Sequence, residues 1–481
     1  MLFFIDQHGC AKNQVDAELL VGILRDRGWQ SAASPDDADL IIVNSCGFIN
    51  SAKKESIDAV ITARTAYPKA KVLLAGCLSE RYAEDLAENL VEADAFFGNG
   101  DLSRLPEILD TLFPPKEGKN TSHSLVRPVL KPAQTGVCGG NRPELLNFPR
   151  SAYVKITEGC DNWCSFCAIP IIRGALRSRP ISDIVAECAA LVARNVWELN
   201  LIGQDLAAYG TGSGDAVSKD TGSVSPLSRL LQAISALRGD FRVRLLYIHP
   251  DHFPRDILPV MTADSRFFPY FDIPFQSGDR EIIHAMNRKG DPDSYRQLVS
   301  DIRSAFETPD NPYGRIALRT TLLTGFPGET DEAFERTARF LSDIRSTWSG
   351  SFVWSREEGT AADSMKKRVS GKQAKERQDV LKAIQERITP EELTYFVGKQ
   401  VEVLVEELIP LDEEPSDGAD IPASRLALGR SWFQAPDVDG SVVLQYEDTH
   451  RDLSGSPVAA GSVVRALVTA VNGVDVQAVV R

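Results

Sequence analysis

Three cysteines lie close together in the stretch "EGCDNWCSFCAIP", residues 158–170. Cys160, Cys164 and Cys167 have the spacing C-x3-C-x2-C, and thiolates this close can bind a metal. Zinc sites usually combine separated pairs of ligands, and ferredoxin sequences use a different spacing with a fourth cysteine. The next cysteine, Cys188, lies in the helical pattern "DIVAECAALVARN" and is expected to pack against the domain core. Three thiolates on a 4Fe–4S cluster would leave one iron open to a substrate.

Three more cysteines follow predicted strands in the first hundred residues. This region reads as strand, turn and helix three times, and the strands "LFFIDQHGC", "ADLIIVNSC" and "AKVLLAGC" end at Cys10, Cys46 and Cys77. In a doubly wound parallel sheet the carboxyl ends of the strands meet at the edge where ligands bind. The alternative is three small buried fillers, because free cysteine packs like a small hydrophobic residue. The position at the strand ends favours a metal site.

The pattern of elements predicts an α/β protein with three domains. Residues 1–113 form the N-terminal doubly wound domain, and residues 114–147, rich in Pro, Gly and polar residues, form a linker that contains Cys138, to which no role is assigned. In residues 148–396 six strands alternate with helices, which predicts a parallel sheet curved into a partial or full barrel with its site at the carboxyl ends of the strands. Short alternating strands in residues 397–481 predict a small all-β barrel.

Composition limits the classes of function. The chain has 481 residues, of which 43% are hydrophobic and 25% charged, as in a soluble globular protein, and no stretch reaches the roughly 18 apolar residues of a membrane helix. We therefore expect a cytoplasmic protein with no membrane contact, whose eight cysteines are too few and too clustered for a disulfide framework. The net charge of -14 argues against a surface that binds nucleic acid everywhere. The terminal barrel, with 14 acidic and 6 basic residues, suits a basic partner protein, although a solvated acidic surface is the alternative.

The cysteine motif and its surroundings resemble the radical S-adenosylmethionine superfamily. The motif follows the first strand of a half-barrel, and the aromatic Phe166 precedes the last cysteine. The resemblance implies that Cys160, Cys164 and Cys167 hold a 4Fe–4S cluster whose open iron chelates the amino and carboxylate groups of S-adenosylmethionine. One electron would then cleave the sulfonium to give a 5′-deoxyadenosyl radical. A zinc or ferredoxin-like site is the alternative.

Nearly the whole chain is similar to the methylthiotransferases, which join a three-cysteine domain, a radical barrel and a terminal TRAM barrel. This resemblance implies a second 4Fe–4S cluster on Cys10, Cys46 and Cys77 that takes part in sulfur delivery. Several motifs are similar to the branch that modifies an aspartate of ribosomal protein S-twelve: "GCAKNQVDAE", "EGCDNWCSFCAIPIIRGALRSRP", "LIGQDLAAYG", "YIHPDHFP", "YFDIPFQ", "LRTTLLTGFPGE" and "GRSWFQAPDVDG". The branch that modifies adenosine in transfer RNA typically has Gln-Met-Asn after the first cysteine, where this chain has Ala-Lys-Asn. The entry "IDQHGC" and the acidic stretch 410–422 depart from the family pattern.

Four residues are candidates for binding the cofactor. Gln204 and Asp205 follow the second strand of the barrel, where radical enzymes commonly bind the methionyl end of the cofactor, although Asp205 could instead cap a helix. Gly325 and Gly328 in "GFPG" end another strand. They could let the backbone approach the cofactor or simply form a turn.

Arginines and histidines near these motifs have weaker claims. Arg173, Arg177 and Arg179 follow the cysteine loop and could bind a substrate carboxylate, although solvated arginines are more common. His249 and His252 in "YIHPDHF" could reach the cavity, but a structural role is the expected one.

The predicted reaction inserts a methylthio group at the β-carbon of an aspartate. Acid and base side chains cannot activate that C–H bond near pH 7, so the difficult step belongs to the cofactors. The predicted partners are ribosomal protein S-twelve, free or on the small subunit, and an electron donor such as flavodoxin or ferredoxin; the sequence does not identify the sulfur donor. The alternatives are a transfer-RNA methylthiotransferase and a nonenzymatic iron–sulfur sensor or RNA-binding adaptor. The presence of all six cysteines argues against the last.

Overall fold

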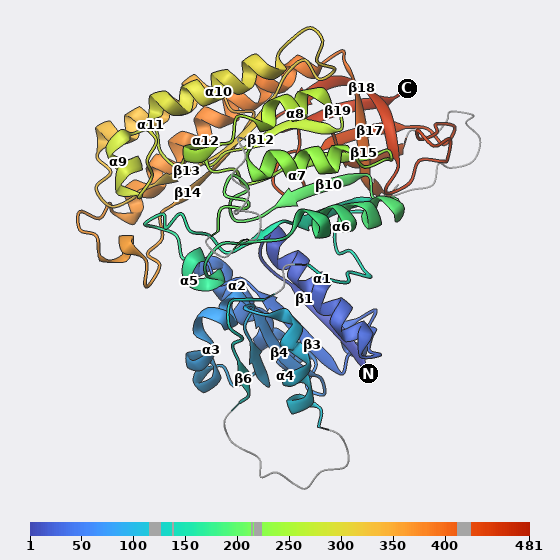
Figure 1. The fold of residues 1–481 in the computed structure, drawn as a ribbon, viewed down its shortest axis with the longest axis vertical. Coiled ribbons are helices and arrows are strands. Elements are labelled where there is room, and N and C mark those ends of the chain that lie inside the picture. The colour runs from blue at the N-terminus through green and yellow to red at the C-terminus, as the bar shows by residue number, and fades with distance from the viewer. Residues whose placement is uncertain (115–126, 137–138, 213–214, 216–223, 411–424) are drawn as a thin grey trace.

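The computed structural model describes residues 1–114, 127–136, 139–212, 215, 224–410 and 425–481. Cys138 and nearly all of the acidic stretch 410–422 lie outside these residues. Figure 1 shows the N-terminal domain below a larger α/β domain, with a small β-barrel beside the latter. Within the described residues, no helix has both the length and the apolar character needed to cross a bilayer.

The N-terminal domain contains a six-stranded sheet in the order β2-β1-β3-β4-β5-β6, and all its neighbouring strands are parallel. The central strands are buried along almost their whole length, as expected where helices cover both faces. The strands are β1 (Leu2–Gln7), β2 (Gln30–Ser31), β3 (Leu40–Ser45), β4 (Lys71–Gly76), β5 (Ala95–Phe97) and β6 (Val129–Leu130). The helices are α1 (Ala11–Asp26), α2 (Asn50–Ala66), α3 (Cys77–Asn89) and α4 (Leu105–Leu112). The doubly wound parallel sheet is confirmed.

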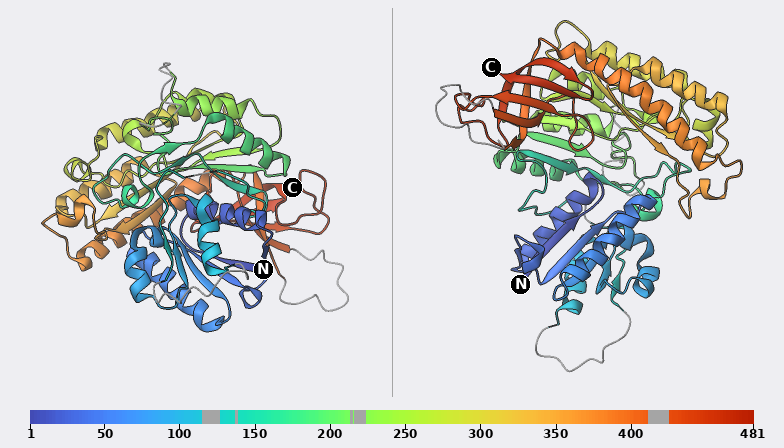
Figure 2. Two further views of the ribbon diagram at one scale, coloured as in Figure 1. Left: turned by 60° about the horizontal axis from the view of Figure 1, so that its bottom comes forward. Right: turned by 180° about the vertical axis from the view of Figure 1, so that it is seen from behind.

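The central domain contains six parallel strands, each added beside the one before it in the sequence. The first and last strands do not pair, so the sheet is a partial barrel, and Figure 2 shows its helices in an arc outside the strands. The strands are β7 (Ser151–Lys155), β10 (Glu198–Ile202), β11 (Arg242–Leu245), β12 (Phe267–Asp272), β13 (Ala317–Thr324) and β14 (Trp348–Val353). The short pair β8 (Thr157–Glu158) and β9 (Arg177–Ser178) lies beside them. The helices are α5 (Ile169–Arg173), α6 (Ile181–Ala193), α7 (Pro226–Ser235), α8 (Ile257–Ala263), α9 (Arg280–Ala285), α10 (Pro292–Phe306) and α11 (Asp331–Ile344).

A long helix, α12 (Gly371–Leu393), leads to the terminal barrel. It includes Pro390 near its carboxyl end. Two side chains before the proline hold the helix in place: Gln385 and Thr389 both donate to the carbonyl of Thr347, at 3.3 and 2.9 Å. This tertiary anchoring offsets the backbone hydrogen bond that proline removes.

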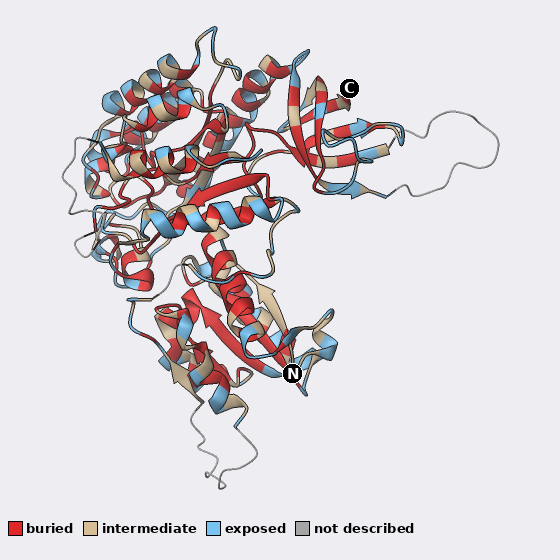
Figure 3. Ribbon diagram, turned by 45° about the vertical axis from the view of Figure 1, so that its right-hand side comes forward, coloured by how far each residue is buried: buried red, intermediate tan, exposed pale blue. Residues whose placement is uncertain are grey.

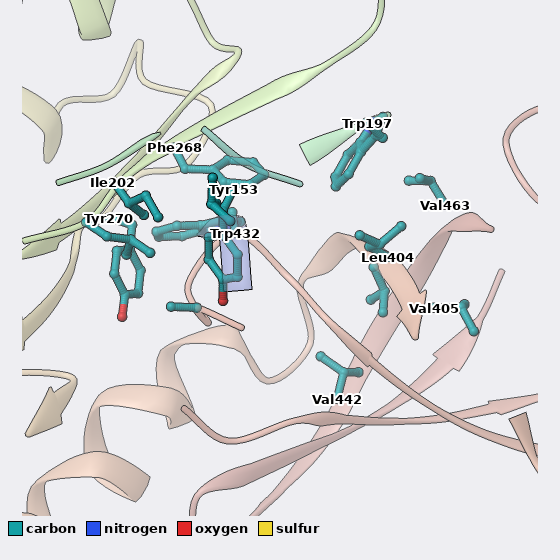
Figure 4. Packing of buried hydrophobic residues seen from close by; sticks show 14 of the residues in the cluster. Tyr153, Trp197, Ile202, Phe268, Tyr270, Leu404, Val405, Trp432, Val442 and Val463 are labelled. Carbon is teal, nitrogen blue, oxygen red and sulfur yellow. The ribbon is translucent and has the colours of Figure 1, made fainter. Parts of the chain in front are cut away.

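The terminal domain is a closed five-stranded barrel in the order β15-β16-β17-β19-β18. Its strands are β15 (Gln400–Ile409), β16 (Arg425–Arg430), β17 (Val442–Tyr446), β18 (Val463–Asn472) and β19 (Asp475–Val480). Figure 4 shows Trp432, which follows β16, packed among aromatic residues of the central sheet such as Tyr153 and Phe268. The indole of Trp348 also donates to the carbonyl of Phe433 at 2.6 Å. The small barrel predicted from the sequence is therefore packed directly on the partial barrel.

Helix α1 joins the N-terminal domain to the central domain. Eleven of its residues are buried, and these include four polar ones, Lys12, Asn13, Asp16 and Glu18. Figure 3 shows that the buried residues of this helix continue to the place where it meets the central domain. A helix buried on several sides needs partners for its charges, and the central domain supplies them.

Candidate active site between two cysteine triads

The first triad, Cys10, Cys46 and Cys77, lies at the carboxyl edge of three adjacent strands, as predicted. Cys10 precedes α1, Cys46 follows β3, and Cys77 begins α3. Two glycines allow the three loops to meet. A Cβ atom added to Gly9 would lie 3.1 Å from Cβ of Cys46, and one added to Gly47 would lie 2.5 Å from the carbonyl oxygen of Cys77.

Cys77 is the most enclosed member of the first triad. Its sulfur accepts hydrogen bonds from Asn99 Nδ2 and Arg173 Nη2, both at 3.4 Å, and its thiol donates to Asn13 Oδ1 at 3.3 Å. Burial raises the pKa of the Cys77 thiol to about 12, although the charge of Arg173 opposes this shift, and burial also raises the pKa of Cys46. A buried thiol of this kind becomes a thiolate when a cationic group binds it.

The second triad, Cys160, Cys164 and Cys167, lies on the loop between β8 and α5. Backbone bonds fold this loop: the amide of Cys160 donates to the carbonyl of Gly174 at 3.1 Å, and that of Cys167 to the carbonyl of Cys164 at 2.9 Å. Gly159 begins the loop with φ +72°, and an added Cβ would lie 2.1 Å from the Ala175 carbonyl oxygen. Burial raises the pKa of Cys160 and of Cys167 to about 12.

His249 contacts the second triad. Its Nε2 lies 3.8 Å from the sulfur of Cys164, and its Nδ1 accepts a hydrogen bond from the amide of Asp251 at 3.3 Å. Burial lowers the pKa of His249 to about 3, and Arg288 acts in the same direction, so the ring is neutral at pH 7. A neutral ring that accepts at Nδ1 carries its proton on Nε2, which faces the sulfur. The purely structural role expected from the sequence is therefore too narrow.

Asp205 fixes the cysteine loop to the strand ends. One carboxylate oxygen accepts from the backbone amide of His249 at 3.0 Å, and the other from Asn162 at 2.8 Å and from His252 Nε2 at 2.6 Å. Burial raises the pKa of this carboxyl, but the bond from His252 and the nearby charges hold it at about 2. Asp205 caps no helix, since the following residues form turns. Its neighbour Gln204 has a buried Oε1 with no hydrogen-bond partner in the described structure.

The two candidate glycines have local reasons for their type. Gly325 has φ +76°, and an added Cβ would lie 2.4 Å from Cβ of Ala374 on α12. Gly328 has φ +91°, and its amide donates to the carbonyl of Lys367 at 2.9 Å. Both conformations favour glycine, and cofactor binding by these residues stays a prediction.

A ring of four buried charges joins the two triads. Arg173 pairs with Asp16 at 2.9 Å and with Glu158 at 2.8 Å, and Lys155 pairs with the same two carboxylates, at 2.6 Å in the case of Glu158. Asp16 belongs to the N-terminal domain and the other three to the central domain. Because the charges alternate and each is paired, the ring can remain dry between the domains.

The remaining arginines after the second triad also bind the protein itself. Arg173 is buried, so the expectation of a solvated side chain is wrong for it. Arg177 Nη1 donates to the carbonyls of Arg173 and Ala175 at 3.1 and 3.0 Å. Arg179 Nη1 donates to the carbonyl of Lys155 at 2.9 Å. The guanidinium groups of Arg173 and Arg179 also form ion pairs with carboxylates, whereas Nε of Arg177 is buried without a hydrogen-bond partner in the described structure. Cys188 packs in the core of the central domain, as expected.

The donor atoms of both triads fit an iron–sulfur cluster better than a single ion. Within the described part of the chain, no group of three or more His, Cys, Asp or Glu side chains is arranged to hold one metal ion. The thiols of each triad nevertheless lie near one another. Burial is the largest cause of the raised pKa values of Cys77 and Cys167, and the charges of the other cysteines in the same triad raise them further, which requires those cysteines to be close. A 4Fe–4S cluster binds each thiolate through a different iron atom and so accepts wider spacing.

Unpartnered oxygens beside the second triad fit an organic cofactor. Thr157 Oγ1 and Gln204 Oε1 are buried without hydrogen-bond partners in the described structure, at the carboxyl ends of β7 and β10. A Cβ atom on Gly203 would lie 2.2 Å from Thr157 Oγ1, so only glycine leaves space beside this oxygen. Buried acceptors normally have a donor, and an amino or hydroxyl group of S-adenosylmethionine would supply one.

Sequence reasoning missed the interdomain charge ring and the histidine contact. Asp16 and Glu158 lie within the motifs "GCAKNQVDAE" and "EGCDNWCSFCAIPIIRGALRSRP", but nothing in these motifs indicates that the two carboxylates share partners across the domains. A charged residue on an otherwise apolar helix face was the available signal, as for Asp16 and Glu18 in "QVDAELLVGIL".

Family models match three parts of the chain. Residues 2–98 match "Uncharacterized protein family UPF0004", residues 154–341 the "Radical SAM superfamily", and residues 397–480 the "TRAM domain". These matches coincide with the sheet that carries the first triad, the partial barrel that carries the second, and the closed barrel.

A solved structure shares the fold at low identity. The radical S-adenosylmethionine methyltransferase TsrM from Kitasatospora setae, solved with cobalamin and a [4Fe-4S] cluster, aligns with a TM-score of 0.55 and 15% identity, covering 75% of this chain and 76% of that one. This similarity supports the arrangement of the fold alone.

Curated relatives match over nearly the full length. The "Ribosomal protein uS12 methylthiotransferase RimO" of Treponema denticola is 55% identical over 478 residues, covering 99% of this chain and 100% of the relative. Proteins of the same name from Thermotoga sp. and Desulfosudis oleivorans are 36% and 37% identical, and each alignment covers at least 90% of both chains. The chain belongs to the RimO family of radical SAM methylthiotransferases.

Proposed function

We propose that this protein is a cytoplasmic enzyme that transfers a methylthio group to the β-carbon of an aspartate in ribosomal protein uS12. The observation that carries the proposal is a link between the segments of the two triads: Arg173, which ends α5 just after the second triad, donates to the sulfur of Cys77 in the first. Sulfur delivery and hydrogen abstraction must act on the same substrate carbon, which requires both triads to face one site.

Each triad would hold one 4Fe–4S cluster. The cluster of the second triad would also bind S-adenosylmethionine, with Gln204, Asp205, Gly325 and Gly328 as the proposed cofactor-binding residues. When bound, these groups supply the one-electron chemistry and the sulfur transfer that acid and base side chains cannot provide at an unactivated C–H bond.

The side chains around the clusters orient and protect the site. His249 presents its Nε2 proton to the sulfur of Cys164, and Asp205 holds both this histidine and Asn162 of the cysteine loop. The ring that includes Arg173 and Asp16 is buried at the interface between the domains, and we propose that it helps to exclude water there. Excluding water protects reactive species from side reactions.

The proposed partners follow from charge and chemistry. A chain with a net charge of -14 suits a basic ribosomal protein better than a nucleic acid. The reaction also needs an electron donor, for which a flavodoxin or a ferredoxin is proposed.

The test is mass spectrometry of uS12 after anaerobic incubation with the reconstituted enzyme, S-adenosylmethionine, dithionite and sulfide. We expect a methylthio mass gain on one aspartate, which the Cys164→Ala variant does not produce. Transfer RNA incubated in parallel should stay unmodified. Modification of the RNA in place of the protein would refute the proposed substrate.

A further inference from the structure

A cavity of about 440 Å³ lies against the second triad. Its lining includes the sulfur-bearing residues Cys164 and Cys167 together with exposed residues of three other segments, namely Ile171 of α5, His284 of α9 and the loop that follows β14. In Figure 1 this loop, drawn in orange, lies near α5 and α9. The cavity therefore connects the second triad to the molecular surface.

An exposed tryptophan stands at this cavity. Trp163 has 61% of its surface exposed, although it lies within the cysteine loop. Its φ of +50° is uncommon for a residue other than glycine, and the side chain of Asn287 holds this conformation by donating to the Trp163 carbonyl at 2.9 Å. Large aromatic side chains presented in this way are typical anchors of protein interfaces.

Positive charge lies next to residues that line the cavity. Met365 lines the cavity, and the next three residues, Lys366, Lys367 and Arg368, are all exposed. Lys289, two positions after the cavity-lining Asn287, is exposed as well.

These lysines are available for a partner. Two arginines of the same region are paired, Arg280 with Asp291 and Arg356 with Asp363. By contrast, in the described residues no carboxylate lies within 4.0 Å of the amino groups of the three lysines. The neighbouring segments also carry the exposed carboxylates of Glu281 and Glu358, which offset their positive charge. Residues 366–368 contain no acidic residue, so the positive charge is greatest there.

The geometry points to this surface, formed by Trp163, Ile171, His284 and residues 365–368, as the docking site of a small acidic one-electron carrier of the flavodoxin or ferredoxin type. This inference rests on the proposed function, which requires such a donor. The reduced carrier gives one electron to the cluster of the second triad and is itself oxidised, and no bond is made or broken in that step.

Two observations favour a redox carrier over RNA. The cavity reaches the cysteines themselves, which shortens the path of the electron, and redox carriers use small interfaces in which complementary charge sets the rate of encounter. The positive charge is also confined to a short segment of a strongly acidic chain, whereas RNA binding needs a wider basic face.

The test compares two double variants. Lys366→Glu/Lys367→Glu reverses the charge at the proposed surface, and Lys69→Glu/Lys382→Glu makes the same change at exposed sites before β4 and on α12. Binding of purified flavodoxin is measured by calorimetry at low ionic strength, with and without the clusters. Methylthiolation of uS12 is measured with flavodoxin hydroquinone and, separately, with dithionite, which needs no docking site.

For Lys366→Glu/Lys367→Glu we expect the Kd for flavodoxin to rise about tenfold or more and the flavodoxin-driven rate of methylthiolation to fall by a similar factor. The dithionite-driven rate should stay within about twofold of that of the unmodified chain, as should every value for the control variant. Equal flavodoxin binding by the two variants would overturn the inference. An equal loss of the dithionite-driven rate in Lys366→Glu/Lys367→Glu would also overturn it, because the surface would then bind the substrate protein or ribosomal RNA. If the unmodified chain fails to methylthiolate uS12 with dithionite, the proposed function fails, and the binding comparison still decides the docking site.

Discussion

Nη2 of Arg173 lies 3.4 Å from the sulfur of Cys77, so a residue of the second triad's segment binds directly to a member of the first triad. The same guanidinium pairs with Asp16 of the N-terminal domain and Glu158 of the central domain. One side chain thus spans both domains and touches the atom that would bind a cluster, which makes it a positioning residue for the reaction.

Arg173→Lys should lower the rate of methylthiolation by about 10- to 100-fold, the usual effect of losing a partner of a metal ligand. Lysine keeps the charge, but it cannot reach two carboxylates, the side-chain oxygen of Asn13 and the sulfur of Cys77 at once. The EPR signal of the reduced first cluster should change, whereas cleavage of S-adenosylmethionine without substrate should not.

Arg194→Lys is the matched control, because in the described structure the guanidinium of Arg194 donates only to the backbone carbonyls of Arg142 and Pro143. An unchanged EPR signal in Arg173→Lys, or equal effects of the two substitutions, would contradict the positioning role.

His249→Phe should lower the reduction potential of the second cluster, because the Nε2 proton faces the sulfur of Cys164 and hydrogen bonds to sulfur tune cluster potentials. Potentiometric titration followed by EPR measures the shift. His249→Gln can still offer an N–H donor and should recover part of it. A potential that is the same in all three proteins would show that the 3.8 Å contact has no electronic role.

Gly47→Ala should move Cys46 away from Cys77 and prevent the first triad from binding its cluster, since the added Cβ would lie 2.5 Å from the Cys77 carbonyl oxygen. The readout is the iron content after reconstitution, which should fall by about half. Gly371→Ala is the control, because a Cβ at that position meets nothing within 4 Å and the residue begins a helix. Full iron loading of Gly47→Ala would show that the two loops can move apart freely.

Glu198→Gln should loosen the terminal barrel. Burial raises the pKa of Glu198, but Arg430 and Arg244, which donate to it at 2.8 and 2.9 Å, lower it far below 4.5. Removing one partner of a buried pair costs about 3–5 kcal/mol of unfolding free energy at pH 7. The control is Glu407→Gln at an exposed position, which should change the unfolding free energy by less than about 0.5 kcal/mol.

The same variant has a defined pH dependence. The pKa of Glu198 is lower in the folded state, so its ionised form contributes stability above pH 4.5, and this contribution is lost as the pH falls below that value. The difference in urea midpoint between Glu198→Gln and the unmodified chain should therefore narrow at pH 4 relative to pH 7. If the difference in urea midpoint were the same at pH 4 and pH 7, the loss of stability in Glu198→Gln would come from packing and not from the charge of Glu198.

Local sequence patterns were enough to predict much of this fold. Alternating apolar strands and helical periodicities identified the main strands of all three domains, and the rule that parallel strands share a carboxyl edge brought Cys10, Cys46 and Cys77 together. Strands of two or three residues, such as β2 and β6, escaped because so short a run carries no periodicity.

Contacts between domains could not be predicted in this way. Arg173 and Asp16 are 157 positions apart, and nothing near either residue indicates the other. His249 is 85 positions from Cys164, and the motif "GRSWFQAPDVDG", which carries Trp432, gives no sign of its packing on the central domain. These contacts depend on how whole domains pack, which local propensity does not encode.

The most direct test of one cluster on each triad is the iron content of two triple variants, Cys10→Ala/Cys46→Ala/Cys77→Ala and Cys160→Ala/Cys164→Ala/Cys167→Ala, after anaerobic reconstitution. Each should retain half of the iron and sulfide of the unmodified chain, with the spectrum of one 4Fe–4S cluster, and neither should modify uS12. If either variant kept all the iron or lost all of it, the account of one cluster on each triad would be wrong.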